Sequence, residues 1–169
     1  GTWGKRSGSG DGPRPAALLI RRSDGALTRV RNQSFDLPMD FAGEPLYWLD
    51  TIPAPQTFAW LKAESGRARD VRLRAQLVES AGYLDATELV LPFLNATLEG
   101  GDVSEVRGAA AMAIAWHPSP DGVRRLTEHA RHDRSIEVRR ASVAALGRFR
   151  TPEALKALLA LAREGDEET

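Results

Sequence analysis

The chain has 169 residues, no cysteine, and equal numbers of acidic and basic residues, 23 of each. This length suits one domain, or a small domain with an appendage. The lack of cysteine excludes disulfides and thiolate metal sites, and the zero net charge argues against a general affinity for nucleic acid or anionic membranes. No apolar run approaches the length of a transmembrane helix.

Residues 1–15 are rich in Gly, Ser and Pro and cannot build a core of their own. Within them Trp3, flanked by Lys5 and Arg6, predicts an aromatic anchor with a basic rim that binds a partner protein. The alternative is a tail that folds back onto its own domain. Glycines at 8, 10 and 12 lack the strand and helix of a phosphate loop, so no nucleotide site is expected.

Residues 16–66 are expected to form a small β-rich cap with one helix. Ala16–Arg31 contains two strand-like runs around the turn Ser23-Asp24-Gly25, which predicts a hairpin. The alternation of apolar and polar residues from Phe35 to Phe41 predicts a further strand, which Pro38 confines to an edge.

The remainder of this cap contains an aromatic run and a helix. We expect Leu46–Leu49 to seal the first end of a helical stack; an aromatic ligand box is the alternative. Pro53–Glu64 should form a helix, because prolines at 53 and 55 are tolerated in its first turn. Ser65-Gly66 should end it, and the helix would act as a half-repeat that covers the stack.

Residues 67–169 carry a repeat with a period of 32 to 33 residues. Its units begin at Leu73-Arg74, Val106-Arg107 and Val138-Arg139. Thr87, Ser119 and Thr151 stand 32 residues apart, and each can cap a second helix with its hydroxyl. Each unit therefore consists of two helices, and three units should stack into an α-solenoid.

The segment Ser135–Ala162 is the most regular unit. Val138, Ala141, Ala145 and Leu146 predict one apolar side of its first helix, which Gly147 should end in a left-handed conformation. Thr151-Pro152-Glu153 predicts the start of the second helix. The apolar stripe of that helix is expected at Leu155, Leu158, Leu159 and Ala162.

The run VRRASVAALGRFRTPEALKALLALA is similar to HEAT repeats of the short variety called PBS-lyase HEAT-like. VRGAAAMAIAWHPSPDGVRRL and VRLRAQLVESAGYLDATELVLPFL resemble two further copies, so the resemblance covers about residues 68–164. Trp116-His117 departs from it, since the usual Leu-Gly stop is missing. The resemblance implies a scaffold or adaptor; a minority of the family serve chromophore-attaching lyases.

Three histidines offer little support for catalysis. His129 and His132 permit a surface metal site, but their place near a predicted helix C-terminus favours a structural role, and no third ligand has motif spacing. His117 lies between two predicted helices, and no Ser-His-acid arrangement accompanies it. We expect no catalytic residue, no metal site and no cofactor.

The basic residues have two predicted roles. A strip along the second helices should bind a partner; its members are Arg124, Arg125, Arg131, His132 and Lys156. Arg74, Arg107 and Arg139 recur in phase on the first helices, which predicts pairing between adjacent repeats.

The sequence thus predicts a mainly α fold: an α-solenoid of three HEAT-like hairpins with a small β-rich N-terminal cap and an extended tail. The predicted function is a non-enzymatic accessory or scaffold subunit that binds other subunits of a larger complex, and contact with a membrane-associated assembly is left open. The alternatives are a chromophore-lyase or chaperone-like module and, less favoured, a nucleic-acid-binding module.

The composition is typical of a bacterial protein, and the glycine start favours an exported chain, with a cytoplasmic one as the alternative.

Overall fold

The computed structural model describes residues 16–35, 43 and 45–167. Its elements in chain order are β1 (Ala16–Ser23), β2 (Ala26–Ser34), α1 (Ala54–Arg67), α2 (Val71–Ala81), α3 (Thr87–Glu99), α4 (Ser104–Ile114), α5 (Pro120–His132), α6 (Ile136–Leu146) and α7 (Pro152–Glu167). The fold is a mainly α solenoid with a small β cap at its N-terminal end, as predicted. None of the helices described is long and apolar enough to cross a membrane.

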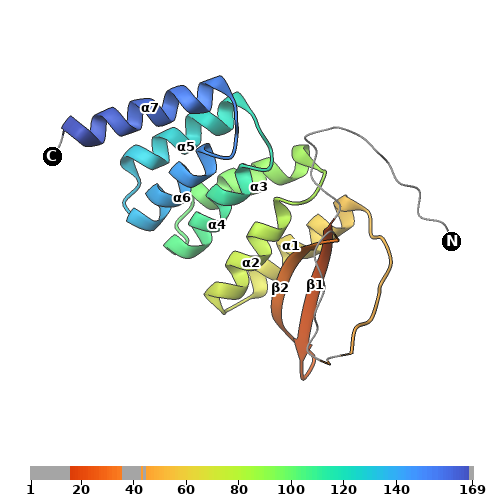
Figure 1. Ribbon diagram of the computed structural model, residues 1–169. Helices are drawn as coiled ribbons and strands as arrows, with labels where there is room; N and C mark the ends of the chain where they lie inside the picture. The colour runs from red at the N-terminus through yellow and green to blue at the C-terminus, as the bar shows by residue number, and fades with distance from the viewer. Residues whose placement is uncertain (1–15, 36–42, 44, 168–169) are drawn as a thin grey trace, which may run out of the picture.

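The helices lie in two layers. The first helices of the repeats, α2, α4 and α6, pack side by side in one layer, and α1, α3, α5 and α7 form the other. Each second-layer helix packs closely on the first helix that follows it, as α3 does on α4 and α5 on α6. Helix α1 packs on α2 in the same manner and so takes the place of a second helix. Figure 1 shows the stack running from the hairpin at one end to α7 at the other.

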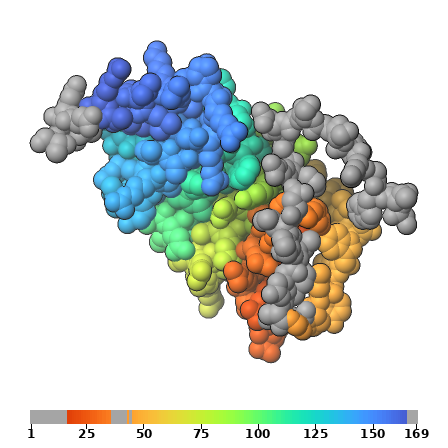
Figure 2. Space-filling view, viewed as in Figure 1, coloured from red at the N-terminus to blue at the C-terminus, as the bar shows by residue number. Residues whose placement is uncertain are grey.

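The hairpin forms as predicted and covers the N-terminal end of the stack. β1 and β2 are antiparallel, and the turn residues Asp24 and Gly25 have φ values of 51° and 76°. Val30 of β2 is buried, and its backbone amide donates to the side-chain oxygen of Gln76 on α2 at 3.0 Å. Asn32 also donates to the hydroxyl of Ser80 at 3.1 Å. The orange-red hairpin therefore lies against α2 in Figure 2.

The aromatic run does not seal the stack, so that prediction is wrong. The side chains from Leu46 to Leu49 are all exposed, Tyr47 by 80% and Trp48 by 58%. The end of the stack is closed instead by β2 and by Phe58 and Leu61 of α1. Among the described residues the run keeps one aromatic contact, between Trp48 and Phe35, whose ring centroids are 6.1 Å apart.

Two predictions fall outside the described residues. The tail with Trp3, Lys5 and Arg6 is one of them, and most of the predicted strand from Phe35 to Phe41 is the other. Phe35 itself lies in a turn directly after β2.

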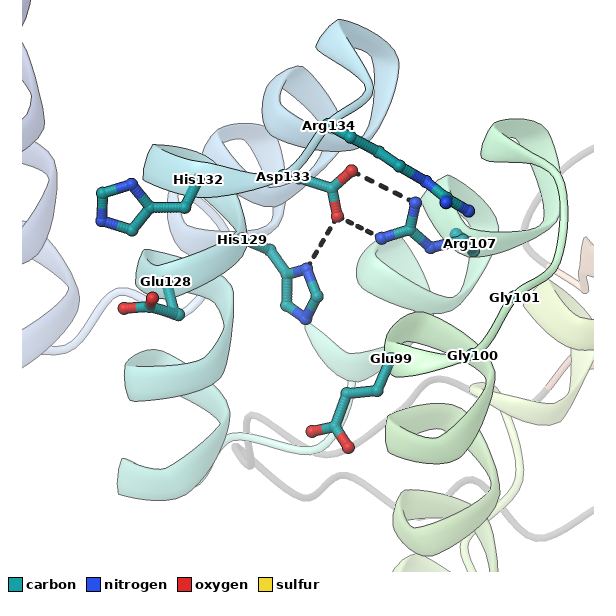
Figure 3. Close-up of a pocket in the computed structure, with 9 residues that line it drawn as sticks. All are labelled: Glu99, Gly100, Gly101, Arg107, Glu128, His129, His132, Asp133 and Arg134. Atoms are coloured by element: carbon teal, nitrogen blue, oxygen red, sulfur yellow. Dashed lines mark hydrogen bonds and ion pairs between the residues drawn. The ribbon is translucent and has the colours of Figure 1, made fainter.

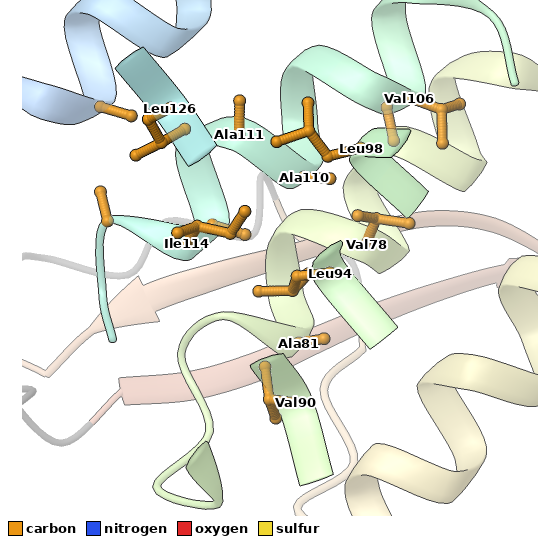
Figure 4. Packing of buried hydrophobic residues seen from close by; sticks show 14 of the residues in the cluster. Val78, Ala81, Val90, Leu94, Leu98, Val106, Ala110, Ala111, Ile114 and Leu126 are labelled. Carbon is orange, nitrogen blue, oxygen red and sulfur yellow. The ribbon is translucent and has the colours of Figure 1, made fainter. Parts of the chain in front are cut away.

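The core follows the repeat. Figure 4 shows Val78 of α2, Leu94 of α3, and Ala111 and Ile114 of α4 in one continuous apolar cluster. The small residues of α4 let the first-layer helices approach closely, since alanine adds little bulk between two backbones. The cluster continues to Leu126 and Leu146, so neighbouring repeats share one core.

Two helix boundaries differ from the predictions. Helix α1 continues through Ser65-Gly66 to Arg67, because glycine weakens a helix but does not by itself end one. The N-cap of α3 is Ala86, and the hydroxyl of Thr87 is instead 2.9 Å from Nδ1 of His117. Ser119 and Thr151 do cap their helices, accepting from the backbone amides three residues further on.

The glycine that ends α6 does not adopt a left-handed conformation. Gly147 has φ of −63°, and the left-handed residue after this helix is Arg150, with φ of 47°. The equivalent Gly82 has the same φ, and there the close approach of α4, not the backbone conformation, requires a glycine. A Cβ there would lie 2.8 Å from the Cβ and 2.9 Å from the carbonyl oxygen of Ala113.

The buried face of α7 is rotated from the predicted stripe. Ala154, Leu158 and Leu161 pack against the rest of the protein, whereas Leu155 and Leu159 are exposed by 59% and 52%. Ala162 is exposed as well. Of the four predicted positions only Leu158 contacts the core.

Gly82→Ala should destabilise the protein by about 1–3 kcal/mol, because the added methyl group overlaps the backbone of α4. Gly147→Ala is the matched control. It has the same φ and only the carbonyls of its own helix near the added methyl group, so it should be neutral or stabilising by up to about 1 kcal/mol. Urea unfolding of both variants measures the difference. Equal free energies of unfolding would contradict the close α2–α4 contact.

Candidate protein-binding site

Arginines of the first helices α2 and α4 reach the loop before the next repeat. Arg74 of α2 pairs with Asp102 at 2.5 Å, and Arg107 of α4 pairs with Asp133 through both guanidinium nitrogens. Arg139 of α6 donates to the backbone carbonyl of Asp133 at 2.7 Å. The predicted pairing between adjacent repeats is confirmed for Arg74 and Arg107, whereas Arg139 contacts the loop directly before its own helix.

The Arg107–Asp133 pair is the most buried of these contacts. The side chains are exposed by only 6% and 1%, and Arg107 also donates to the backbone carbonyl of Leu98 at 2.9 Å. Asp133 further accepts from the backbone amide of Ser135 at 2.9 Å and lies 2.8 Å from Nδ1 of His129. One carboxylate thus joins α4, α5 and the start of α6.

The pKa of the Asp133 carboxyl is lower than its ordinary value. Burial raises that pKa, but the hydrogen bonds from Ser135, His129 and Arg107 and the charge of Arg107 together outweigh the effect of burial. Asp133 therefore stays ionised at neutral pH. Its contribution to stability is present above the unfolded-state pKa of about 4 and is lost as the pH falls below it.

This cluster forms the floor of an open hollow of about 500 Å³ between two repeats. Figure 3 shows His129 with Nδ1 toward Asp133 and its other ring nitrogen toward Glu99. Glu128, His132 and Arg134 lie around the rim. No three His or carboxylate side chains of the described residues gather closely enough to hold a metal ion. The hollow is thus a polar surface feature whose central charges are already satisfied.

The predicted basic strip is largely paired with carboxylates. Arg125 contacts Asp121 and, across to α3, Glu99, while Arg124 pairs with Asp121 at 2.6 Å. Arg131 makes two hydrogen bonds to Glu164 of α7, at 2.9 and 2.7 Å. Arg125 and Arg131 therefore link α3 to α5 and α5 to α7, and the positive field of the strip is reduced.

His132 and Lys156 stand apart from these pairs. His132 is exposed at the rim of the hollow, and Lys156 is exposed on α7 with no ion pair to any described residue. Binding of a partner by these residues stays a prediction.

A contact that the sequence did not predict joins the turns after α2 and α4. Buried His117 lies 2.9 Å from the hydroxyl of Thr87, and the ring of Trp116 lies 4.7 Å from that of Tyr83. Arg148 adds a cation–π contact over Trp116 at 5.7 Å. The only sequence signal was the departure from the Leu-Gly pattern at Trp116-His117.

The family model for HEAT repeats matches residues 91–169. Together with the two-layer stack, the match shows that residues 91–169 form HEAT repeats. The chain has no significant match among curated proteins and none among solved structures. HEAT repeats generally mediate protein–protein interaction or scaffolding.

Replacing Arg107 tests the buried pair between HEAT units. Arg107→Met should cost about 3–5 kcal/mol, because it leaves the Asp133 carboxylate buried without its cation. Arg74→Met is the control; its pair is partly exposed, so the cost should stay near or below about 1 kcal/mol. Arg107→Met combined with Asp133→Leu should recover much of the loss. Denaturant unfolding at neutral pH that showed equal costs for the two single variants would contradict the role of burial.

The buried His117 predicts a pH dependence of the HEAT domain. Burial lowers the pKa of its imidazole and outweighs the Gly82 backbone and Asp85, which act in the opposite sense. The folded state favours neutral His117, so stability is present above the unfolded-state pKa of about 6.5 and falls as the pH drops below it. The melting temperature should drop between pH 7.5 and 5.5 by more in the wild type than in His117→Gln. Parallel curves would contradict this assignment.

Proposed function

We propose that this HEAT-repeat protein is an accessory or scaffold subunit that holds other proteins in a larger assembly. One observation carries the proposal: the apolar run from Leu46 to Leu49 is exposed beside the β cap. Large exposed apolar clusters on soluble proteins are a mark of interaction surfaces, and Tyr and Trp are enriched among residues that dominate binding energy.

The aromatic surface extends beyond that run. Ile52 and Phe35 are also about half exposed, and the ring of Phe35 contacts Trp48. Water contact with so many apolar side chains is unfavourable by roughly 25 cal/mol per Å², so covering them with a partner would be favourable. The aromatic surface, residues 35 and 46–52 together, is therefore the part of the molecule where we expect a partner protein to bind.

The other candidate functions gain less support. A nucleic-acid-binding surface needs unpaired cations and stacking aromatics on one face, whereas three arginines of the second helices are paired with carboxylates. A chromophore site needs an apolar pocket, whereas the hollow at Asp133 is lined mainly by charged residues and glycines.

Site-specific photocrosslinking in the native cells tests the proposal. A benzophenone amino acid at Trp48 should yield one discrete protein adduct, because a bound partner lies within reach of that side chain. The same amino acid at Leu89, an exposed position on α3, is the control and should yield fewer adducts. Adducts with lipid alone, or no difference between the two positions, would contradict a protein-binding role for this surface.

A further inference from the structure

The first helices present the same face along the stack, and among the described residues only α6 leaves it uncovered. Val78 of α2 and Ala111 of α4 are exposed by 2% and 0%, because the next first helix packs on each of them. Val143 is the equivalent residue of α6, and it is exposed by 40%. Ile136, Arg140 and Gly147 lie on the same face as Val143, because successive members are three or four residues apart, and they are exposed too.

Helix α7 of the second layer also has apolar side chains that no further repeat covers. Val123 of α5 is exposed by 8%, whereas its equivalent in α7, Leu155, is exposed by 59%. Leu159, one turn further on, lies beside it on the exposed face. We call this surface the open end; it consists of Ile136, Arg140, Val143, Gly147, Leu155 and Leu159. Figure 2 shows α6 and α7, in blue, at the opposite end of the molecule from the hairpin.

The shape of the open end suits a helix. Between α4 and α6 a Cβ placed on Gly108 would lie only 3.6 Å from the Cβ of Ala141, so first-layer helices pack with their backbones close. On the exposed face of α6, Arg140 stands at the position of Gly108, while Gly147 matches Gly82, where a Cβ would lie 2.8 Å from the Cβ of Ala113. A helix that lay on α6 as α6 lies on α4 could therefore approach it closely and cover Val143.

The charge of the open end indicates what kind of helix would fit. Arg140 lies within the apolar face, and Lys156 and Arg163 lie beside Leu155 and Leu159. None of these three cations forms an ion pair with a described residue, in contrast to Arg125 and Arg131 on α5. Glu137 of α6 is hydrogen-bonded to the hydroxyl of Ser135 and also lies within the electrostatic range of Arg140, with which it forms no ion pair. An apolar surface with unpaired cations is complementary to an amphipathic helix with acidic flanks.

We propose that the open end binds an acidic amphipathic helix of a partner protein, seated where a further first helix would lie. The proposal rests on the scaffold function and names the class of partner for one surface of it. A second copy of the chain fits less well. A symmetric contact would bring two open ends together, and with them two sets of the same three cations.

The binding of a synthetic helix tests the proposal on the full chain. The probe is a fluorescent peptide with the sequence of residues 131–147, which already packs on α4, carrying Arg134→Glu, Arg139→Glu and Arg140→Glu. It should bind the wild type, and fluorescence anisotropy should show weaker binding as salt is added. Val143→Asp in the protein should weaken binding at least about tenfold, as should Arg140→Glu, because each places like charge against the peptide.

Leu89→Asp is the matched control, since Leu89 is exposed by 43% on α3, away from the open end. It should leave binding unchanged. No binding of the acidic peptide, equal binding of the unsubstituted basic peptide, or an equal effect of Leu89→Asp would overturn the proposal. So would dimerisation of the wild type that Val143→Asp abolishes in sedimentation. None of these results affects the crosslinking test at Trp48, so the scaffold function and the binding of a helix at the open end can fail separately.

Discussion

The structure depends on one constraint: no repeat can bury both of its apolar faces by itself. Each first helix presents one face to the preceding repeat and another to the next, as Ala111 of α4 does toward α6. Small residues such as Gly82 and Gly108 allow the backbones of this layer to come close. The chain is therefore stable as a stack, and the last helix at each end must be covered by a structure other than a repeat of the same stack.

The two ends meet this requirement differently. At the N-terminal end β2 and α1 cover α2, and the hydrogen bonds from Val30 to Gln76 and from Asn32 to Ser80 fix the hairpin in place. At the other end α6 and α7 keep Val143 and Leu155 exposed. Between the ends, ion pairs hold the repeats in register: Arg107 with Asp133 inside the protein, and Arg131 with Glu164 on its surface. Arg125 and Arg131 of α5 are used for this purpose, and the two ends are the surfaces where we propose that partners bind.

The sequence predicted the repeat well because its signals are local and recur three times. Helix caps at Ser119 and Thr151 and the in-phase arginines could be read from spacing alone. What it could not predict depends on contacts between repeats: Thr87 contacts His117, 30 residues away, instead of capping its helix. The burial of Leu155 was mispredicted for a related reason, since periodicity shows that a helix has an apolar stripe but not which part of it a neighbour covers. The exposed Tyr47 and Trp48 look like core residues in the sequence because aromatic runs usually are.

Hydrogen–deuterium exchange of the chain, alone and in the complex recovered from its native source, measures most directly whether the ends of the stack are the binding surfaces. We expect the amides of α6 and α7, and those near Trp48, to become protected in the complex. The amides of α3, α4 and α5 around the Arg107–Asp133 pair should exchange equally in both states, because these helices are already packed on both sides. Protection confined to the hollow between Glu99 and His132, with none at either end, would contradict this view of the molecule.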